Sequence, residues 1–140
     1  MADDAGLERF VEAQRSIYPQ ALAELRAGDK RSHWMWFIFP QIAGLGRSPT
    51  AQFYAIADRA EAEAYSRHEV LGPRLVECTR AMLDWAGQRS AERVLGSIDA
   101  VKFRSSMTLF EACVDDPAPF AVALDAFFGG QRDEATLARL

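Results

Sequence analysis

Two short segments hold the residue types that could bind or transform a ligand. The first, residues 30–37, contains two cations, one histidine and three aromatic side chains. Aromatic faces can stack a planar base, and cations can neutralise a phosphate. We therefore predict that this region binds a planar, anionic ligand through Lys30, His33, Trp34, Trp36, Phe37 and Gln41.

The same region also has an explanation that needs no ligand. Residues 34–39 form a continuous apolar run, which is typical of a buried element of either kind. In that interpretation the aromatic side chains belong to the core and the two cations form a solvated rim. The sequence leaves both interpretations open.

The second segment is residues 99–106. On a helix, Asp99, Lys102, Ser105 and Ser106 are spaced to share one face. The carboxylate could stabilise a developing positive charge or activate water, and the amine could hold an anion. We predict catalytic roles for Asp99 and Lys102, with the two serines positioning the substrate. The simpler alternative is a surface ion pair beside two small polar residues.

Neither segment makes a site alone, so we predict that both line one pocket. The first supplies stacking surface and cations, and the second supplies a carboxylate, an amine and hydroxyls. If the pocket is functional, Lys102→Ala should weaken ligand binding and leave stability nearly unchanged. If it is structural, the same change should cost more than ~2 kcal/mol, because a buried partner is left unpaired.

Spacing and charge exclude several other functions. His33 and His68 have no carboxylate or cysteine at ligand spacing, so we predict no metal site. Gly44 and Gly46 are too few for a dinucleotide fingerprint, and we predict no cofactor. The net charge of −4 argues against a general nucleic-acid binder. The expected partner is a small nucleotide-like molecule, and the oligomeric state stays open.

The cysteines and the hydropathy pattern predict a cytoplasmic protein. Cys78 and Cys113 are too few for a disulfide framework, and both fall in apolar helical stripes, so we expect reduced core thiols. The most apolar window, residues 34–45, is far shorter than the ~20 residues that a membrane span needs. The acidic N-terminus is no secretory signal.

These segments must be positioned by helices. The chain has 140 residues, which suits one domain over 1–140. Cap, proline and glycine signals predict an all-α fold of about eight short helices without a sheet. We expect a first helix capped by Asp3 or Asp4 and a second that starts at Tyr18-Pro19. Further helices are expected over residues 50–57, 59–65, 72–87, 90–95, 97–114 and 116–128 and after Asp133, with residues 34–39 as a helical turn or a packed loop.

Several strings resemble a known family. They are residues 30–41, 44–48, 61–65, 71–75 and 102–110, including the rare strings Trp-Met-Trp-Phe and Ser-Ser-Met-Thr-Leu-Phe. Together they resemble a bacterial family of unknown function, about this long and sometimes mislabelled calpastatin. The resemblance covers about residues 7–140 and implies an all-α fold but no reaction. The calpastatin label carries no weight, because that inhibitor repeat is largely disordered and this composition is globular.

A more distant similarity concerns the layout. The aromatic-proline segment, the helix with Tyr54, residues 107–110 and the helix after Pro117 are arranged as in the NAD- and ADP-ribose-associated domain family. That similarity implies small helical N-glycosidases, and it transfers no catalytic residue. Two functions follow as hypotheses. One is a module that binds a nucleotide-like or ADP-ribose-like compound, and the alternative is an N-glycosidic hydrolase in which Asp99 stabilises an oxocarbenium-like transition state.

Overall fold

A computed structural model describes residues 3–140, with side chains from Gly6 onward. Over this range the chain forms helices and no strand; Ile42 and Ile56 make one isolated parallel bridge. The predicted all-α fold is confirmed. The helices of the described range are α1 (Asp3–Ala27), α2 (Met35–Ile38), α3 (Pro49–Phe53), α4 (Arg59–Arg67), α5 (Leu71–Leu83), α6 (Ala91–Leu95), α7 (Ser97–Cys113), α8 (Ala118–Phe128) and α9 (Glu134–Leu137).

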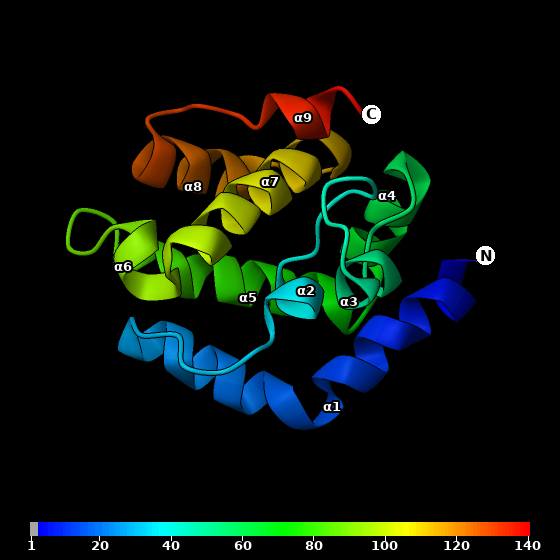
Figure 1. Cartoon of the computed structure of the whole chain (residues 1–140), viewed down its shortest axis with the longest axis horizontal. Helices are drawn as coiled ribbons and strands as arrows, with labels where there is room; N and C mark the ends of the chain where they lie inside the picture. Colours follow the sequence, from blue (N-terminus) through cyan, green and yellow to red (C-terminus); the bar gives the residue numbers. More distant parts are fainter. Residues whose placement is uncertain (1–2) are drawn as a thin grey trace.

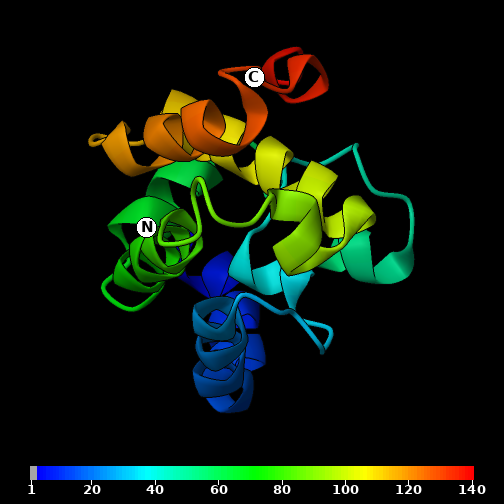
Figure 2. The ribbon, with the colours of Figure 1, turned by 90° about the vertical axis from the view of Figure 1, so that its left-hand side faces the viewer.

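Helix α5 lies at the centre of the arrangement. It packs against α1 on one side and α8 on the other, and α4 also contacts it. Figures 1 and 2 show α1 at one edge of the molecule and α8 with α9 at the opposite edge. Helix α7 packs against α4, α6, α8 and α9, and its buried Phe103 and Phe110 join the common core. The start of α7 is thereby held beside the loop that follows α1.

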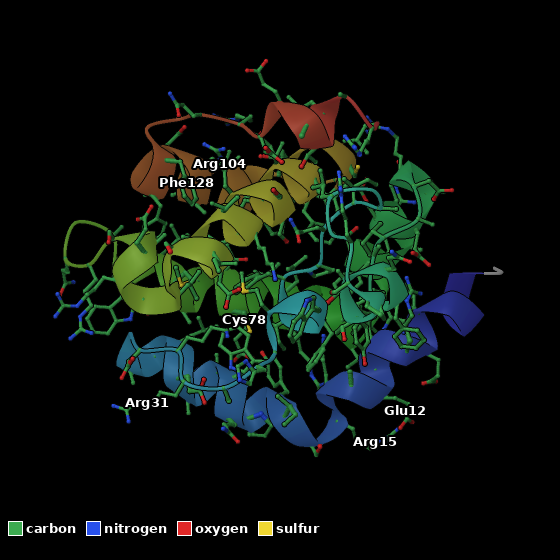
Figure 3. The ribbon with its side chains drawn as sticks, viewed as in Figure 1. Glu12, Arg15, Arg31, Cys78, Arg104 and Phe128 are labelled. Carbon is green, nitrogen blue, oxygen red and sulfur yellow. The ribbon has the colours of Figure 1, made fainter. Side chains whose placement is uncertain are left out.

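Helix α1 corrects one prediction. The expected second helix at Tyr18-Pro19 is wrong, because α1 runs without a break from Asp3 to Ala27 with Pro19 inside it. Leu7 and Leu25 are both fully buried, so one apolar face spans the proline and outweighs the lost hydrogen bond. The ring of Pro19 crowds the carbonyl four residues earlier, at Arg15, and such a clash bends a helix. Figure 1 shows the bend, and Figure 3 labels Arg15 next to it.

The aromatic run forms a single buried helical turn, α2. This is one of the two conformations predicted for it from the sequence. Met35, Phe37 and Ile38 are buried in it. The chain after it is fixed by two backbone hydrogen bonds: the N–H of Ile56 donates to the carbonyl of Gln41 at 2.8 Å, and that of Ala43 donates to the carbonyl of Ile56 at 2.8 Å. The end of the segment 34–43 is therefore fixed to Ile56.

Helix ends differ from several predicted ones. Ser48 caps α3 by accepting a hydrogen bond from the N–H of Ala51 at 3.1 Å, but α3 stops at Phe53 instead of the predicted residue 57. The helix expected over residues 97–114 begins at Ser97, but Gly96 and not Ser97 is its N-cap residue, and the positive φ of 92° at this position suits glycine. The expected cap at Asp3 or Asp4 lies outside the described side chains.

Candidate functional site

The loop before α2 and the first turns of α7 meet at Asp99. The Nζ atom of Lys30 lies 2.9 Å from Oδ2 of Asp99, and the Nζ atom of Lys102 lies 3.9 Å from Oδ1. These are the only two lysines of the chain, whose other fourteen cations are arginines. One carboxylate therefore faces two ammonium groups, and the two segments singled out by the sequence come together here.

Each lysine also lies over an indole ring. The Nζ atom of Lys30 is 4.9 Å from the ring centroid of Trp34, and that of Lys102 is 5.1 Å from the ring centroid of Trp36. Both distances are within the range of cation–π attraction. These five residues, Lys30, Trp34, Trp36, Asp99 and Lys102, form the Asp99 cluster.

The Lys30 end of the cluster is closed. Only 8% of the Lys30 side chain is exposed, and its Nζ atom also donates to the carbonyl of Ser32 at 2.6 Å. Trp34 has no exposed surface, so it offers no face to a ligand in this structure. In the predicted alternative, the aromatic side chains belong to the core and the two cations form a solvated rim. The first part holds for Trp34, and the second does not hold for the buried side chain of Lys30.

The Lys102 end of the cluster is open to solvent. The exposed fraction is 26% for the Lys102 side chain and 19% for that of Asp99, and Trp36 is half-buried. A small hollow is lined by Trp36, Gln41 and Tyr54. Its volume of about 10 Å³ holds at most about one water. Any larger ligand would lie on the surface formed by Trp36 and Lys102.

Sequence reasoning missed the residue that fixes the loop, Glu24 of α1. Its Oε1 accepts hydrogen bonds from the N–H of Arg31 at 2.9 Å, the N–H of Ser32 at 3.1 Å and the indole of Trp34 at 2.8 Å. Its Oε2 accepts from the hydroxyl of Ser32 at 2.6 Å and the amide of Gln20 at 3.0 Å. The sequence carries no signal for this role, because a glutamate near a helix end is usually solvated.

The same hydrogen bonds set the protonation of Glu24. Burial opposes the charged carboxylate, but the donors from Ser32, Arg31, Trp34 and Gln20 together outweigh it and lower the pKa to about 2. Glu24 is therefore an anion over the whole physiological range. It anchors the loop that carries Lys30 and Trp34.

Two predicted site residues on α7 serve other contacts. The hydroxyl of Ser105 donates to Oδ2 of Asp133 at 2.8 Å and so ties the start of α9 to α7. Thr136 donates to the same oxygen at 2.5 Å. Ser106 is fully buried, and its hydroxyl oxygen has no hydrogen-bond partner among the described residues. The structure does not bring either serine to the Asp99 cluster, contrary to the predicted convergence.

Two residues of the first segment also lie outside the cluster. His33 is exposed, and none of the hydrogen bonds found among residues 6–140 joins it to the cluster. Phe37 is buried against Tyr54, with ring centroids 5.3 Å apart, and its carbonyl accepts from the amide of Gln14 at 2.8 Å. Phe37 is thus part of the core.

The two cysteines and His68 have structural roles. Cys78 and Cys113 are free and buried, as predicted, and burial raises the pKa of Cys78 to about 12. Nδ1 of His68 accepts from the N–H groups of Val70 at 3.1 Å and Leu71 at 3.3 Å, which caps the start of α5. In the described part of the chain, no group of three or more His, Cys, Asp or Glu side chains is placed to hold a metal ion.

None of the helices between residues 3 and 140 is long and apolar enough to cross a membrane.

Comparison with known proteins identifies a family and a similar crystal structure, but their descriptions name no reaction. A model of the family described as "Protein of unknown function (DUF1810)" matches residues 4–140. A conserved hypothetical protein of Mycobacterium tuberculosis, Rv1873, has a similar crystal structure, with 48% sequence identity and a TM-score of 0.92. The match covers 96% of this chain and 95% of that one. No curated protein matches the chain.

Proposed function

We propose that this chain, which belongs to the family described as "Protein of unknown function (DUF1810)", is a module that binds a nucleotide-like or ADP-ribose-like compound. Family membership names no ligand, so the proposal rests on the geometry of the Asp99 cluster. The ligand would lie on the exposed end, where Lys102 contacts a phosphate and Trp36 contacts the base.

The observation that carries the proposal is an imbalance of charge. Asp99 is the one carboxylate within ion-pair distance of the two lysines among the described residues, and Lys30 holds its Oδ2 at 2.9 Å. Lys102 is left with the longer contact of 3.9 Å. A partly buried cation without a close partner gains free energy when an anion binds it. A phosphate would supply that anion.

The neighbouring side chains match the rest of such a ligand. Trp36 is half-buried, so its indole offers surface on which a planar base can stack. Gln41 lines the same small hollow and carries both a donor and an acceptor for a ribose or a base edge.

The alternative, hydrolysis of an N-glycosidic bond, asks more of Asp99. In that reaction its carboxylate would stabilise a positive charge on the ribose. Two ammonium groups already face the carboxylate, so its charge is less available to a developing cation. Binding without hydrolysis is therefore the function we favour.

Isothermal titration calorimetry with ADP-ribose, AMP and ribose 5-phosphate tests the proposal. We expect ADP-ribose to bind, and Lys102→Met to weaken binding at least about tenfold through loss of a charge-assisted contact. Lys102→Arg should restore part of the affinity. Arg15→Met is the matched control, because it removes one exposed cation from α1, on a different element.

One outcome would overturn the proposal, and another would replace binding with hydrolysis as the function. If none of the three compounds binds at millimolar concentration, the proposed function is wrong. The second outcome is the release of a free base from AMP or NAD, measured by chromatography. If Lys102→Met and Asp99→Asn abolish this release, the protein is a hydrolase.

A further inference from the structure

A second concave region lies along the face of α5 beside α4 and α8. Two hollows adjoin there and share Ser66, Gly72, Val76 and Arg80 in their walls. The larger, of about 690 Å³, opens toward the end of α1 at Arg26. The smaller, of about 210 Å³, opens toward α8. No residue of the Asp99 cluster lines either hollow.

The close approach of α4 and α5 shapes this region. A Cβ atom added at Gly72 would lie 2.3 Å from the carbonyl oxygen of Ser66, so only glycine lets the two helices approach this far. The end of α4 and the first turn of α5 thereby form one continuous wall. The wall that the two hollows share is therefore part of the packed helices, whereas residues 114–116 of the smaller hollow lie between α7 and α8.

The smaller hollow has an apolar wall and a charged rim. Asp115 and Asp116 line the rim together with Arg67 and Arg80, and Oδ1 of Asp116 accepts a hydrogen bond from the N–H of Ala118 at 3.3 Å. The volume of this hollow, about 210 Å³, equals about seven times the ~30 Å³ share of one water, which suits one ring or a short chain. Such a size lies below the ~300–1,000 Å³ of sites for drug-sized ligands. Its apolar lining consists of Leu75, Val76, Val114, Pro119 and Phe120.

One cation at the rim is uncommitted. Arg80 lines both hollows, and among the described residues its side chain makes no ion pair and no hydrogen bond. Arg67 is held by Asp115 through two contacts of 3.2 and 3.1 Å. Glu77 is engaged by the hydroxyl of Tyr18 and lies 3.6 Å from Arg26. The guanidinium of Arg80 is therefore the group left to meet a ligand.

We propose that Arg80 and the smaller hollow form a site for a small carboxylate with an apolar body. The guanidinium matches a carboxylate through two parallel hydrogen bonds. The apolar body would lie against Val76, Val114 and Pro119, which are half-buried and therefore keep surface that a ligand can contact. This site does not depend on the Asp99 cluster, so either proposal can fail without the other.

Titration of ¹⁵N-labelled protein with benzoate tests the site. We expect saturable shifts of the backbone amides of Gly72, Val76 and Phe120 and of the side-chain Nε of Arg80. Benzamide has the same shape without the charge and should bind at least about tenfold more weakly. Arg80→Gln should weaken benzoate by a similar factor and leave benzamide unchanged. Hexanoate in place of benzoate decides between an aromatic and an aliphatic body.

Two further variants keep the test decisive. Arg93→Gln removes an exposed arginine of α6 that has no ion pair in the described range, and it should bind benzoate as the unchanged protein does. Val76→Phe adds bulk at the wall that both hollows share and should abolish the shifts, while circular dichroism reports an intact fold. Equal binding of benzoate by Arg80→Gln and the unchanged protein, or absence of saturable shifts with both acids, would sink the proposal.

Discussion

Lys30 and Lys102 approach the same carboxylate from two regions that differ in how far their polar groups are satisfied. In the loop before α2, Lys30 has Asp99, the carbonyl of Ser32 and the ring of Trp34 around it, and 8% of its side chain is exposed. On α7, Lys102 has a contact of 3.9 Å and 26% exposure. The comparison teaches that one ion-pair cluster can hold the fold at one end and leave charge for a ligand at the other.

Glu24 extends the satisfied region. Its two oxygens accept five hydrogen bonds from the loop and from α1, so the loop, Trp34 and Lys30 are held as one unit. Within residues 6–140, the polar contacts of Lys102 are limited to Asp99, and its Nζ atom lies over the ring of Trp36. The comparison therefore predicts large losses of stability at Glu24 and Lys30 and a small one at Lys102.

The largest effect is expected for Glu24→Gln. The amide carries donors where the loop also presents donors, so several charge-assisted hydrogen bonds are lost at once, at a cost of about 3–4 kcal/mol. Urea denaturation measures the free energy of unfolding. Glu12→Gln is the matched control, because Glu12 pairs with Arg15 on the exposed side of α1 and should cost under ~0.5 kcal/mol. Similar losses in both variants would break the comparison.

The contribution of Glu24 to the free energy of unfolding should depend on pH. Its pKa is lowered from about 4.5 to about 2 in the folded protein, so the folded state favours the ionised form. The stabilisation is fully present above the unfolded pKa and is lost as pH falls from about 4.5 through about 2. The difference in unfolding free energy between the unchanged protein and Glu24→Gln should shrink over that window. A difference that stays constant down to the lower limit would show that another group anchors the loop.

Sequence reasoning predicted the helices well where apolar periodicity was long, and it failed where a tertiary contact decides. At Pro19 the local breaker signal was overruled because buried leucines on both sides, Leu7 and Leu25, keep one helix face in the core. Glu24 meets Arg31 and Ser32 only because the chain reverses at Gly28, whose φ is 69°. No spacing rule within a helix describes that return.

The candidate site was predicted in part for a related reason. Residues on one helix face share a direction but not a position: Ser105 is six residues after Asp99, about 9 Å further along the axis. The hydroxyl of Ser105 consequently meets Asp133, while Lys102, one turn from Asp99, stays in the cluster. Composition identified the two segments, whereas exposure, which divides Lys30 from Lys102, follows only from packing.

Lys30→Met should cost about 2–3 kcal/mol. The change leaves Asp99 and the carbonyl of Ser32 without their nearest donor in a region that is almost closed to water. The cost stays below that of an isolated buried charge, because Lys102 still faces Asp99. Thermal unfolding followed by circular dichroism measures it. A loss below ~1 kcal/mol would mean that the loop is held by Glu24 alone.

The smallest effect on stability is expected for Lys102→Met, at most about 1 kcal/mol. A partly buried ion pair as long as 3.9 Å contributes little, and the methionine side chain retains apolar contact with Trp36 when the cation–π attraction is lost. A double-mutant cycle with Asp99→Asn separates the two lysines, because it isolates the coupling of each one to the carboxylate. We expect a coupling free energy above ~1.5 kcal/mol for Lys30 with Asp99 and below ~0.5 kcal/mol for Lys102 with Asp99. If Lys102→Met instead destabilises the protein by more than ~2 kcal/mol, its amine is committed to the fold, and no charge remains there for a ligand.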